Sequence, residues 1–267
     1  MTGVLATDLD GTLIPLDGES RQQADLIELT ERLRTHEVLL VYVTGRHLES
    51  IEHVRRLHPL PRPNWIVSDV GTTLYRCDGT APTLVPEYAA HLRSITGATT
   101  TQQLQLLLRG ISGLRLQEDE KQGEFKLSFY VEAGRLRDIT EEIEQLLAKQ
   151  KAPYSLIHSV DPFNGDGLID LLPRGVSKAH ALHWWAEYTA TPLQQLVFAG
   201  DSGNDLAVLT SGCRSVLVGN ASRALADQVQ AIHAAHGWHD RLYLPPEHAT
   251  SGVLAGCQHF GLLPKAM

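Results

Sequence analysis

Short aliphatic runs that alternate with amphipathic segments dominate both ends of the chain. Residues 4–8 and 39–43 are apolar runs of the kind found in strands that are buried on both faces. Between them, Ala24, Ile27 and Leu33 fall at helical spacing. This alternation of strand and helix predicts a parallel sheet with helices on both of its faces.

The same rhythm occupies two separate stretches of the chain. In residues 1–81 and 167–267, helices are expected at residues 21–33, 48–57, 177–188, 206–210, 222–233 and 248–259. Further strands are expected at residues 65–68, 168–172, 196–199, 215–218 and 242–244. Together these elements predict an α/β domain with a Rossmann-like sheet.

The pattern changes between residues 82 and 166. The elements expected there are helices at 86–95, 102–108 and 136–150, an alternating strand at 125–131 and a short strand at 154–158. Alternation of period two is typical of a sheet with one open face. The sequence therefore predicts a core domain formed by residues 1–81 and 167–267, with an α+β domain of residues 82–166 inserted into it.

Composition narrows the range of functions. The chain has 267 residues, with 31 acidic and 23 basic side chains and a net charge of −8. An acidic chain without basic clusters is poorly suited to nucleic acid, so we expect no such partner. The sequence shows no signal peptide and no apolar stretch long enough to span a bilayer, so we expect a cytoplasmic protein without a membrane partner. The scattered Cys77, Cys213 and Cys257 fit reduced thiols.

Two aspartates follow the first predicted strand in the string Asp-Leu-Asp-Gly-Thr, residues 8–12. Ligands of open α/β sheets bind at the carboxyl ends of the strands, and residues two apart in an extended segment point to the same side. We therefore expect Asp8 and Asp10 to face one reacting centre, with Gly11 allowing the turn. One carboxylate can attack phosphorus, while the other serves as general acid and base. The alternative is an ordinary polar loop, against which the complete string argues.

A second acidic string, Gly-Asp-Ser-Gly-Asn-Asp at residues 200–205, also follows an aliphatic run. Mg²⁺ prefers oxygen ligands and usually takes a few carboxylates together with phosphate and water. We expect Asp201 to bind the ion, with Ser202, Asn204 and Asp205 supporting it from behind. The same residue types also form ordinary turns, so this string alone leaves both interpretations open.

Two further groups are candidates for holding a phosphate. Thr44 follows the second predicted strand, where its hydroxyl and the Gly45 amide can donate hydrogen bonds. Lys178 stands near the start of a helix and can act as a point charge that stabilises a transferring phosphoryl group. A lysine at the start of a helix is commonly just solvated, and each of the two groups is weak evidence by itself.

The order of these groups along the chain resembles the four motifs of the haloacid dehalogenase (HAD) superfamily. The resemblance implies that Asp8 is the nucleophile, Asp10 the acid/base, Thr44 a phosphate ligand and Lys178 the charge clamp. It also implies Mg²⁺ as cofactor, held by the carboxylates of Asp8 and Asp201 and by the main-chain carbonyl of Asp10. The insertion would be the type-two cap domain of that superfamily.

Further strings resemble the sucrose-6-phosphate phosphatase group within this superfamily. They are Ser-Asp-Val-Gly-Thr at 68–72, Lys-Leu-Ser-Phe-Tyr at 126–130, Asp-Leu-Leu-Pro at 170–173, the string at 200–205 and the segment 248–254. The resemblance implies hydrolysis of sucrose 6-phosphate and a sucrose-phosphate synthase as partner enzyme. It implies that the substrate-binding residues include Arg46, Lys126, Ser128, Asp170 and Asn204. Lys126 is equally compatible with a solvent-facing position on its strand.

Two positions depart from that group, and several alternatives stay open. Gly11 stands where many sucrose phosphatases have asparagine, and His47 stands where serine is frequent. The alternatives are a phosphatase for mannosylfructose phosphate or another glycosyl phosphate, and a phosphotransferase similar to phosphomannomutase. A non-catalytic sugar-binding module is the alternative from another class. The presence of all four charged residues of the motifs argues against it.

Overall fold

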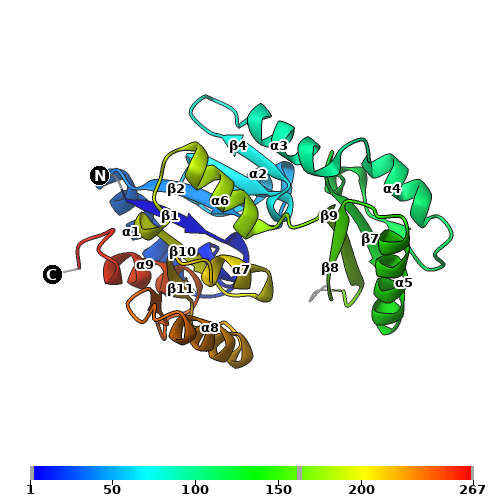
Figure 1. The fold of residues 1–267 in the computed structure, drawn as a ribbon. Helices are drawn as coiled ribbons and strands as arrows, with labels where there is room; N and C mark the ends of the chain where they lie inside the picture. The colour runs from blue at the N-terminus through cyan, green and yellow to red at the C-terminus, as the bar shows by residue number, and fades with distance from the viewer. Residues whose placement is uncertain (1–2, 161–163, 266–267) are drawn as a thin grey trace. The chain divides into compact units, whose positions relative to one another are not determined.

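The computed structural model describes residues 3–160 and 164–265, which divide into two compact units (Figure 1). The core unit comprises Met1–Leu84 and Lys178–Met267, and the inserted unit comprises Val85–Ser177. The predicted fold class, a parallel sheet with helices and an α+β insertion between its halves, is confirmed.

The core unit is built on one eight-stranded sheet. Its strands are β1 (Val4–Thr7), β2 (Leu39–Val43), β3 (Trp65–Ser68), β4 (Thr73–Arg76), β5 (Thr83–Leu84), β10 (Leu196–Gly200), β11 (Arg214–Leu217) and β12 (Leu242–Tyr243). The spatial order is β12-β11-β10-β1-β2-β3-β4-β5, parallel from β12 to β3 and antiparallel at β4 and β5. The strand order reverses direction between β1 and β10. In sheets of this kind, ligands bind beyond the carboxyl ends of the strands at that point.

Helices cover both faces of the core sheet. They are α1 (Ser20–Thr35), α2 (Leu48–Leu57), α6 (Lys178–Tyr188), α7 (Leu206–Leu209), α8 (Arg223–Ala235) and α9 (Ala249–His259). On one face, Leu29 of α1 and Val253 of α9 belong to the same buried cluster as Leu5 of β1. On the other face, Trp185 of α6 lies edge-on to Trp65 of β3, with ring centroids 6.3 Å apart. No helix in the described ranges has the length and apolar character needed to cross a bilayer.

The inserted unit is a four-stranded antiparallel sheet packed against helices. Its elements are α3 (Pro86–Thr96), α4 (Thr101–Leu108), β6 (Arg115–Leu116), β7 (Leu127–Val131), α5 (Leu136–Lys149), β8 (Tyr154–Val160) and β9 (Gly167–Pro173), with strand order β6-β7-β9-β8. Phe129 of β7 and Ile169 of β9 are buried in one cluster with Ile139 and Ile143 of α5. The residues that alternate with them along the strands lie on the opposite face of the sheet.

The structure corrects the placement of residues 167–177, which the sequence pattern assigned to the core. Strand β9 pairs antiparallel with β7 over residues 167–171 and with β8 along its whole length, and the core resumes at Lys178. The aliphatic content of β9 suggested a strand of a parallel sheet. Asp170 in its middle marks instead the open face of a sheet whose other face buries Ile169 and Leu171. The short strands β4, β5 and β6 were not predicted.

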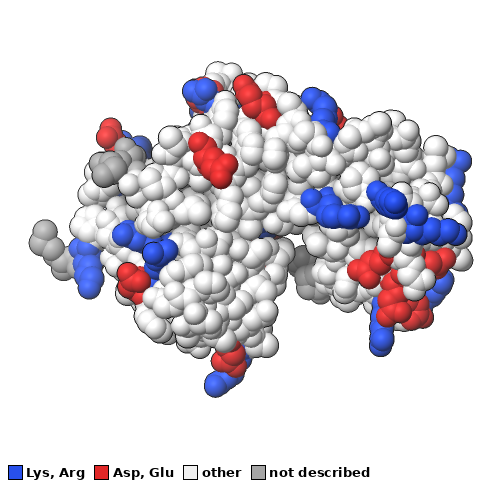
Figure 2. Space-filling view, in the orientation of Figure 1, with Lys and Arg blue, Asp and Glu red and all other residues white. Residues whose placement is uncertain are grey.

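Charged side chains are distributed differently over the two units on the face that Figure 2 shows. Over the core unit they are few and separated, whereas both signs are interspersed more densely over the inserted unit. Over the inserted unit, several Lys and Arg side chains lie in a row across this face, with acidic side chains beside them.

Candidate active site

The two acidic strings lie next to each other at the carboxyl edge of the core sheet. Thr7 of β1 pairs with Ala199 of β10, and the Asp8 N–H donates to the Ala199 carbonyl at 2.9 Å. Oxygens from the carboxylates of Asp8, Asp201 and Asp205 all lie within 4.8 Å of one another. The cluster therefore stands at the point where the strand order reverses, which is where the fold class places a ligand.

Lys178 brings a positive charge into this cluster. It is the first residue of α6, and its side chain is fully buried. The Nζ atom lies 3.1 Å from Asp8 Oδ1 and 2.8 Å from Asp205 Oδ1. It also donates to Asn204 Oδ1 at 2.9 Å. An ammonium group has three hydrogens to donate, so these three acceptors hold Lys178 as a fixed charge.

Asp205 shapes the turn that carries Asp201. One of its oxygens is engaged by Lys178, and the other accepts from the backbone N–H groups of Asp201 and Ser202, each at 3.2 Å. The Ser202 hydroxyl oxygen lies 3.2 Å from the same oxygen. A Cβ at Gly200 would lie 2.8 Å from the Asp205 carboxyl group, so this close packing needs glycine. Asp8 and Asp201 are consequently the two members of the cluster whose carboxylates suit a metal ion.

Asp201 is held by the turn that follows Asp8. Its Oδ1 accepts from Thr12 Oγ1 at 2.9 Å, and its Oδ2 accepts from Asn220 Nδ2 at 3.3 Å. Gly11 has a φ of 68°, and a Cβ there would lie 2.3 Å from Asp201 Oδ2. Gly11 is therefore required both for its backbone conformation and for the close approach of the two acidic strings.

Asn220 is a site residue that sequence analysis did not identify. Its Nδ2 donates to the Gly11 carbonyl at 2.8 Å as well as to Asp201, and its Oδ1 accepts from the Ala249 N–H at 2.8 Å. One side chain thus links three segments that are far apart in the sequence. Asparagine after glycine reads as an ordinary turn, so only the folded structure shows this role.

Replacing Asn220 with alanine should weaken metal binding. The change removes the donor that orients Asp201, and loss of such a supporting partner typically reduces metal affinity by about 10–100-fold. We expect the MgCl₂ concentration for half-maximal activity to rise in that range, with kcat at saturating metal largely retained. A magnesium titration of initial rates measures this, with Asn164→Ala as a control on the inserted unit. Unchanged metal dependence would show that Asn220 does not act on the site.

The cluster carries more negative than positive charge. When all of these groups are ionised, its three carboxylates and one ammonium leave two negative charges unbalanced. Burial raises the pKa of Asp8 to about 8, an effect that Lys178 opposes and Asp205 reinforces. Burial also raises the pKa of Asp201 to about 6, although the hydrogen bond from Thr12 opposes the shift. Burial acts to lower the pKa of Lys178, but Asp205 and Asp8 together hold that pKa above its usual range. A divalent cation would balance the two charges and favour both carboxylates, so the donor set fits a metal.

Metal binding should therefore compete with protons. The pKa values of Asp8 and Asp201 in the folded protein lie above the ordinary value of 3.8. Below pH 3.8 the two carboxyl groups therefore make their full contribution to stability. Without metal, it is lost as the pH rises towards about 8. We expect MgCl₂ to raise the melting temperature more at the upper end of this range, with apparent affinity increasing up to about tenfold per pH unit for each proton displaced.

Thermal unfolding with and without MgCl₂ across this pH range measures the effect. Asp201→Asn, which removes one ligand charge, is the matched control and should lose most of the magnesium-dependent shift. A stabilisation that is the same at both ends of the range would contradict the assignment of these two carboxylates as ligands.

The loop after β2 carries Thr44 and Gly45, and β2 pairs with β1, the strand that leads into Asp8. Thr44 is fully buried, and its N–H donates to the Val67 carbonyl at 2.9 Å. Its Oγ1 accepts from the Arg46 N–H at 3.2 Å, so the hydroxyl hydrogen is free to point elsewhere. Gly45 follows with a half-buried backbone. This geometry suits the predicted role of the loop as a phosphate ligand.

A strained turn after β3 supports that loop. Asp69, Val70 and Gly71 have φ values of 51°, 59° and 99° in succession. A β-branched residue at positive φ is strained, and such strain is typically kept where the backbone must take one special course. Here the N–H groups of Asp69 and Val70 donate to the carbonyls of Arg46 and Thr44 at 3.0 and 3.2 Å. The string at 68–72 therefore serves the neighbouring loop through its backbone.

Asp10 does not join the buried carboxylates. Its side chain is 57% exposed, against 6% for Asp8. Arg46 binds it with two hydrogen bonds, Nε to Oδ2 at 2.8 Å and Nη2 to Oδ1 at 2.6 Å. Of the predicted metal ligands, Asp10 is thus left to contribute its main-chain carbonyl, as the motif resemblance implies.

The predicted substrate residues of the insertion share one face of its sheet. Ser128 and Asp170 lie opposite each other on β7 and β9, and Ser128 Oγ donates to Asp170 Oδ1 at 2.5 Å. Lys126 stands two residues before Ser128 and is buried, on the face that points away from the α5 cluster. Gln122, which sequence analysis missed, holds Ser128 by accepting from its N–H at 2.8 Å.

The other two predicted substrate residues belong to the core unit and contact charged residues of the site. Arg46 binds Asp10, and Asn204 accepts from Lys178 and from the Ser202 hydroxyl, each at 2.9 Å. In this structure each of them therefore orients a residue with a proposed chemical role.

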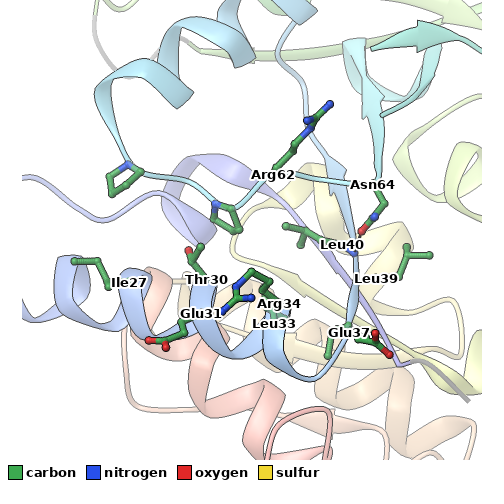
Figure 3. Close-up of a pocket in the computed structure, with 13 residues that line it drawn as sticks. Ile27, Thr30, Glu31, Leu33, Arg34, Glu37, Leu39, Leu40, Arg62 and Asn64 are labelled. Carbon is green, nitrogen blue, oxygen red and sulfur yellow. Dashed lines mark hydrogen bonds between the residues drawn. The ribbon is translucent and has the colours of Figure 1, made fainter. Parts of the chain in front are cut away.

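A pocket of about 780 Å³ in the core unit lies away from this chemistry (Figure 3). It is lined by residues of α1, such as Leu33, and by the segment that precedes β3. Leu40 is at the start of β2 and Asn64 directly precedes β3, so the pocket opens at the amino ends of these strands. Asp8 and Thr44 follow the carboxyl ends, at the opposite edge of the sheet. This pocket therefore does not locate the site, whereas the charged groups do.

Comparisons with known proteins relate the whole chain to sugar-phosphate hydrolases. Residues 1–261 match the model of the sucrose-6F-phosphate phosphohydrolase family. A HAD-like hydrolase of Nitrosococcus oceani is 32% identical, over 96% of this chain and 71% of that protein. The mannosylfructose-phosphate phosphatase of Agrobacterium fabrum is 28% identical over 98% of both chains. The sucrose-phosphatase of Synechocystis, solved in complex with sucrose and phosphate, has a TM-score of 0.74 and 25% identity, covering 98% of this chain and 99% of that one.

Proposed function

The chain belongs to the sucrose-6F-phosphate phosphohydrolase family. We therefore propose that it is a magnesium-dependent phosphatase of sugar phosphates and that sucrose 6-phosphate is its preferred substrate. The family and its named relatives support a phosphoric monoester hydrolase. The observation that carries the mechanism is the group of Asp8, Asp201 and Lys178 at the reversal point of the core sheet, in which Asp8 and Lys178 are buried and Asp201 is half-buried. In this proposal the inserted unit is the cap that selects the substrate.

The first half of the reaction forms an aspartyl-phosphate. A carboxylate oxygen of Asp8 attacks the phosphorus, and the bond between phosphorus and the sugar oxygen breaks. Asp10 gives its proton to the departing sugar oxygen. Lys178 keeps Asp8 in place, and the Thr44 hydroxyl and Gly45 amide bind phosphate oxygens. Magnesium, when bound by Asp8, Asp201 and the Asp10 carbonyl, supplies positive charge against the phosphate.

The second half regenerates the enzyme. A water molecule attacks the phosphorus of the aspartyl-phosphate while Asp10, now a carboxylate, accepts a proton from that water. The bond between phosphorus and the Asp8 oxygen breaks, and inorganic phosphate leaves. Asp10 is then protonated again for the next cycle, so atoms and charge balance over the two steps.

The sugar is expected to contact the polar face of the inserted sheet. Sugar hydroxyls need donors and acceptors, and Lys126, Ser128 and Asp170 supply both on one face. Arg46 and Asn204 are the further candidates from the core unit. A second candidate substrate is mannosylfructose phosphate, because similarity to a phosphatase of that name extends over 98% of both chains.

We also propose a source for the substrate and a cellular compartment for the reaction. A glycosyltransferase that makes a phosphorylated disaccharide must supply the substrate, and a sucrose-phosphate synthase is the partner enzyme that fits. We place the activity in the cytoplasm, since the thiols of Cys77, Cys213 and Cys257 are buried and unpaired.

Phosphate release from a panel of sugar phosphates tests this function. The panel contains sucrose 6-phosphate, mannosylfructose phosphate, glucose 6-phosphate and fructose 6-phosphate, each with MgCl₂ and with EDTA. We expect magnesium-dependent release and the highest kcat/KM for sucrose 6-phosphate. The highest value for mannosylfructose phosphate would reassign the substrate, and transfer of phosphate between sugars without release would indicate a mutase. No release from any of the four would overturn the phosphatase proposal.

A further inference from the structure

We propose that Arg46 is a positioning residue that aims the carboxyl group of Asp10 at the leaving oxygen of the substrate. The inference rests on the proposed acid/base role of Asp10. The geometry that carries it is a two-point contact, with Nε 2.8 Å from Oδ2 and Nη2 2.6 Å from Oδ1. A planar guanidinium that meets a carboxylate at two points fixes both its direction and the plane of its oxygens.

Arg46 is the fixed partner of this pair. Its backbone N–H donates to Thr44 Oγ1 at 3.2 Å, and its carbonyl accepts from the Asp69 N–H at 3.0 Å. Its Nη1 donates to Ser50 Oγ at 2.7 Å. These contacts come from the loop after β2, the strained turn after β3 and the first turn of α2. The backbone and the side chain of Arg46 are thus both held by residues other than Asp10.

Asp10 is the partner that needs holding. Among the described residues, both hydrogen bonds to its carboxylate come from Arg46, and its side chain is 57% exposed. Gly11 follows it at a φ of 68°, a residue type with wide backbone freedom. An exposed carboxylate next to glycine has many orientations available. Arg46 restricts Asp10 to one of them before the substrate arrives.

The departure of the leaving group depends on the orientation of Asp10. A sugar alkoxide departs poorly and needs the proton from Asp10, a contribution of about 10²–10⁴-fold for general acids. An aryl oxide such as 4-nitrophenolate leaves without that proton. Loss of the contact between Arg46 and Asp10 should therefore lower kcat/KM for sugar phosphates and leave it nearly unchanged for aryl phosphates. The competing role, in which Arg46 contacts the sugar directly, makes a different prediction, because that contact would act whether Asp10 is present or not.

A double-mutant cycle separates these roles. The proteins are wild type, Arg46→Gln, Asp10→Ala and the double variant, each assayed for kcat/KM with sucrose 6-phosphate and with 4-nitrophenyl phosphate. This ratio covers the steps up to aspartyl-phosphate formation, in which the leaving group departs. We expect Arg46→Gln to lower the value for the sugar phosphate by about 10–100-fold and for the aryl phosphate by less than about threefold. In the Asp10→Ala background, Arg46→Gln should have no further effect.

Two further variants sharpen the test. Arg46→Lys keeps the charge but lacks the two-point contact, so it should behave like Arg46→Gln rather than like wild type. Arg223→Gln removes an exposed arginine paired with Asp227 on α8 and should leave both kcat/KM values unchanged. Equal thermal midpoints for all the variants would show that the fold is retained.

Three outcomes would overturn the inference. Additive losses in the double variant would show that Arg46 contacts the substrate directly. Equal losses with both substrates in Arg46→Gln, while Asp10→Ala still distinguishes them, would show a role in phosphate binding or folding. Equal losses with both substrates in Asp10→Ala would remove the acid/base role itself, and the proposed mechanism would then fail together with the inference.

Discussion

An Asp8→Asn variant is expected to lose about 10⁴–10⁶-fold in kcat, as removal of a catalytic nucleophile does in enzymes of covalent mechanism. The amide has the same shape as the carboxylate but is a poor nucleophile. Its oxygen still accepts a hydrogen bond, so Lys178, which lies 3.1 Å from Asp8 Oδ1, keeps a partner. Near-normal turnover in this variant would remove the nucleophile assignment.

The same variant should not lose stability. Burial raises the pKa of Asp8 to about 8, which means that ionising this group in the folded protein is unfavourable. Asparagine removes that charge, so without metal at pH 8 we expect a melting temperature equal to or above that of the wild type. Asp17→Asn, the same change at an exposed position, is the matched control and should alter neither activity nor melting temperature. A large loss of stability in Asp8→Asn would mean that the carboxylate is needed for folding, and its loss of activity would then be ambiguous.

Replacing Lys178 with methionine should damage both stability and activity. Lys178 has 1% of its surface exposed, and it is the ammonium partner of Asp8 and Asp205. Removing one partner of a buried ion pair costs about 3–5 kcal/mol, because the other charge stays buried without compensation. Denaturant unfolding in EDTA measures that loss, and assays with MgCl₂ should show at least about a 10³-fold lower kcat. A stability loss below about 1 kcal/mol would show that the pair is not what compensates the buried carboxylates.

A second substitution separates the two effects of Lys178. Combining Lys178→Met with Asp205→Asn removes one of the carboxylates that the lysine leaves behind. We expect the double variant to recover part of the lost stability without recovering activity, because Asp8 still lacks its neighbouring charge. Recovery of both would mean that Lys178 acts on the fold alone.

The parts of the site that sequence analysis predicted are those set by local patterns at strand ends. Asp8, Thr44 and Asp201 each follow an apolar run, and the rule that parallel strands present their carboxyl ends at one edge brings them together. Asn220 could not be found in this way. Its function depends on Gly11 and Ala249, which become its neighbours only when the chain is folded.

The orientation of Asp10 and the boundary at β9 show two other limits of sequence analysis. Spacing predicts that Asp8 and Asp10 lie on one side of an extended segment, but it does not show that Arg46 binds the Asp10 carboxylate. The aliphatic run of β9 has the composition of a parallel strand, and its antiparallel partners lie outside the segment itself. The backbone of Val70 is a third case, because no sequence rule predicts valine at a positive φ.

The interruption of the core by Val85–Ser177 has a consequence for how the protein is made. During translation Asp8 leaves the ribosome before the inserted unit, whereas Lys178 and Asp201 follow that unit. A nascent chain that has emerged only as far as Ser177 therefore contains Asp8, the proposed nucleophile, without Lys178 or Asp201. We therefore expect phosphatase activity only after residues 178–201 have been synthesised and have folded against the strand that precedes Asp8.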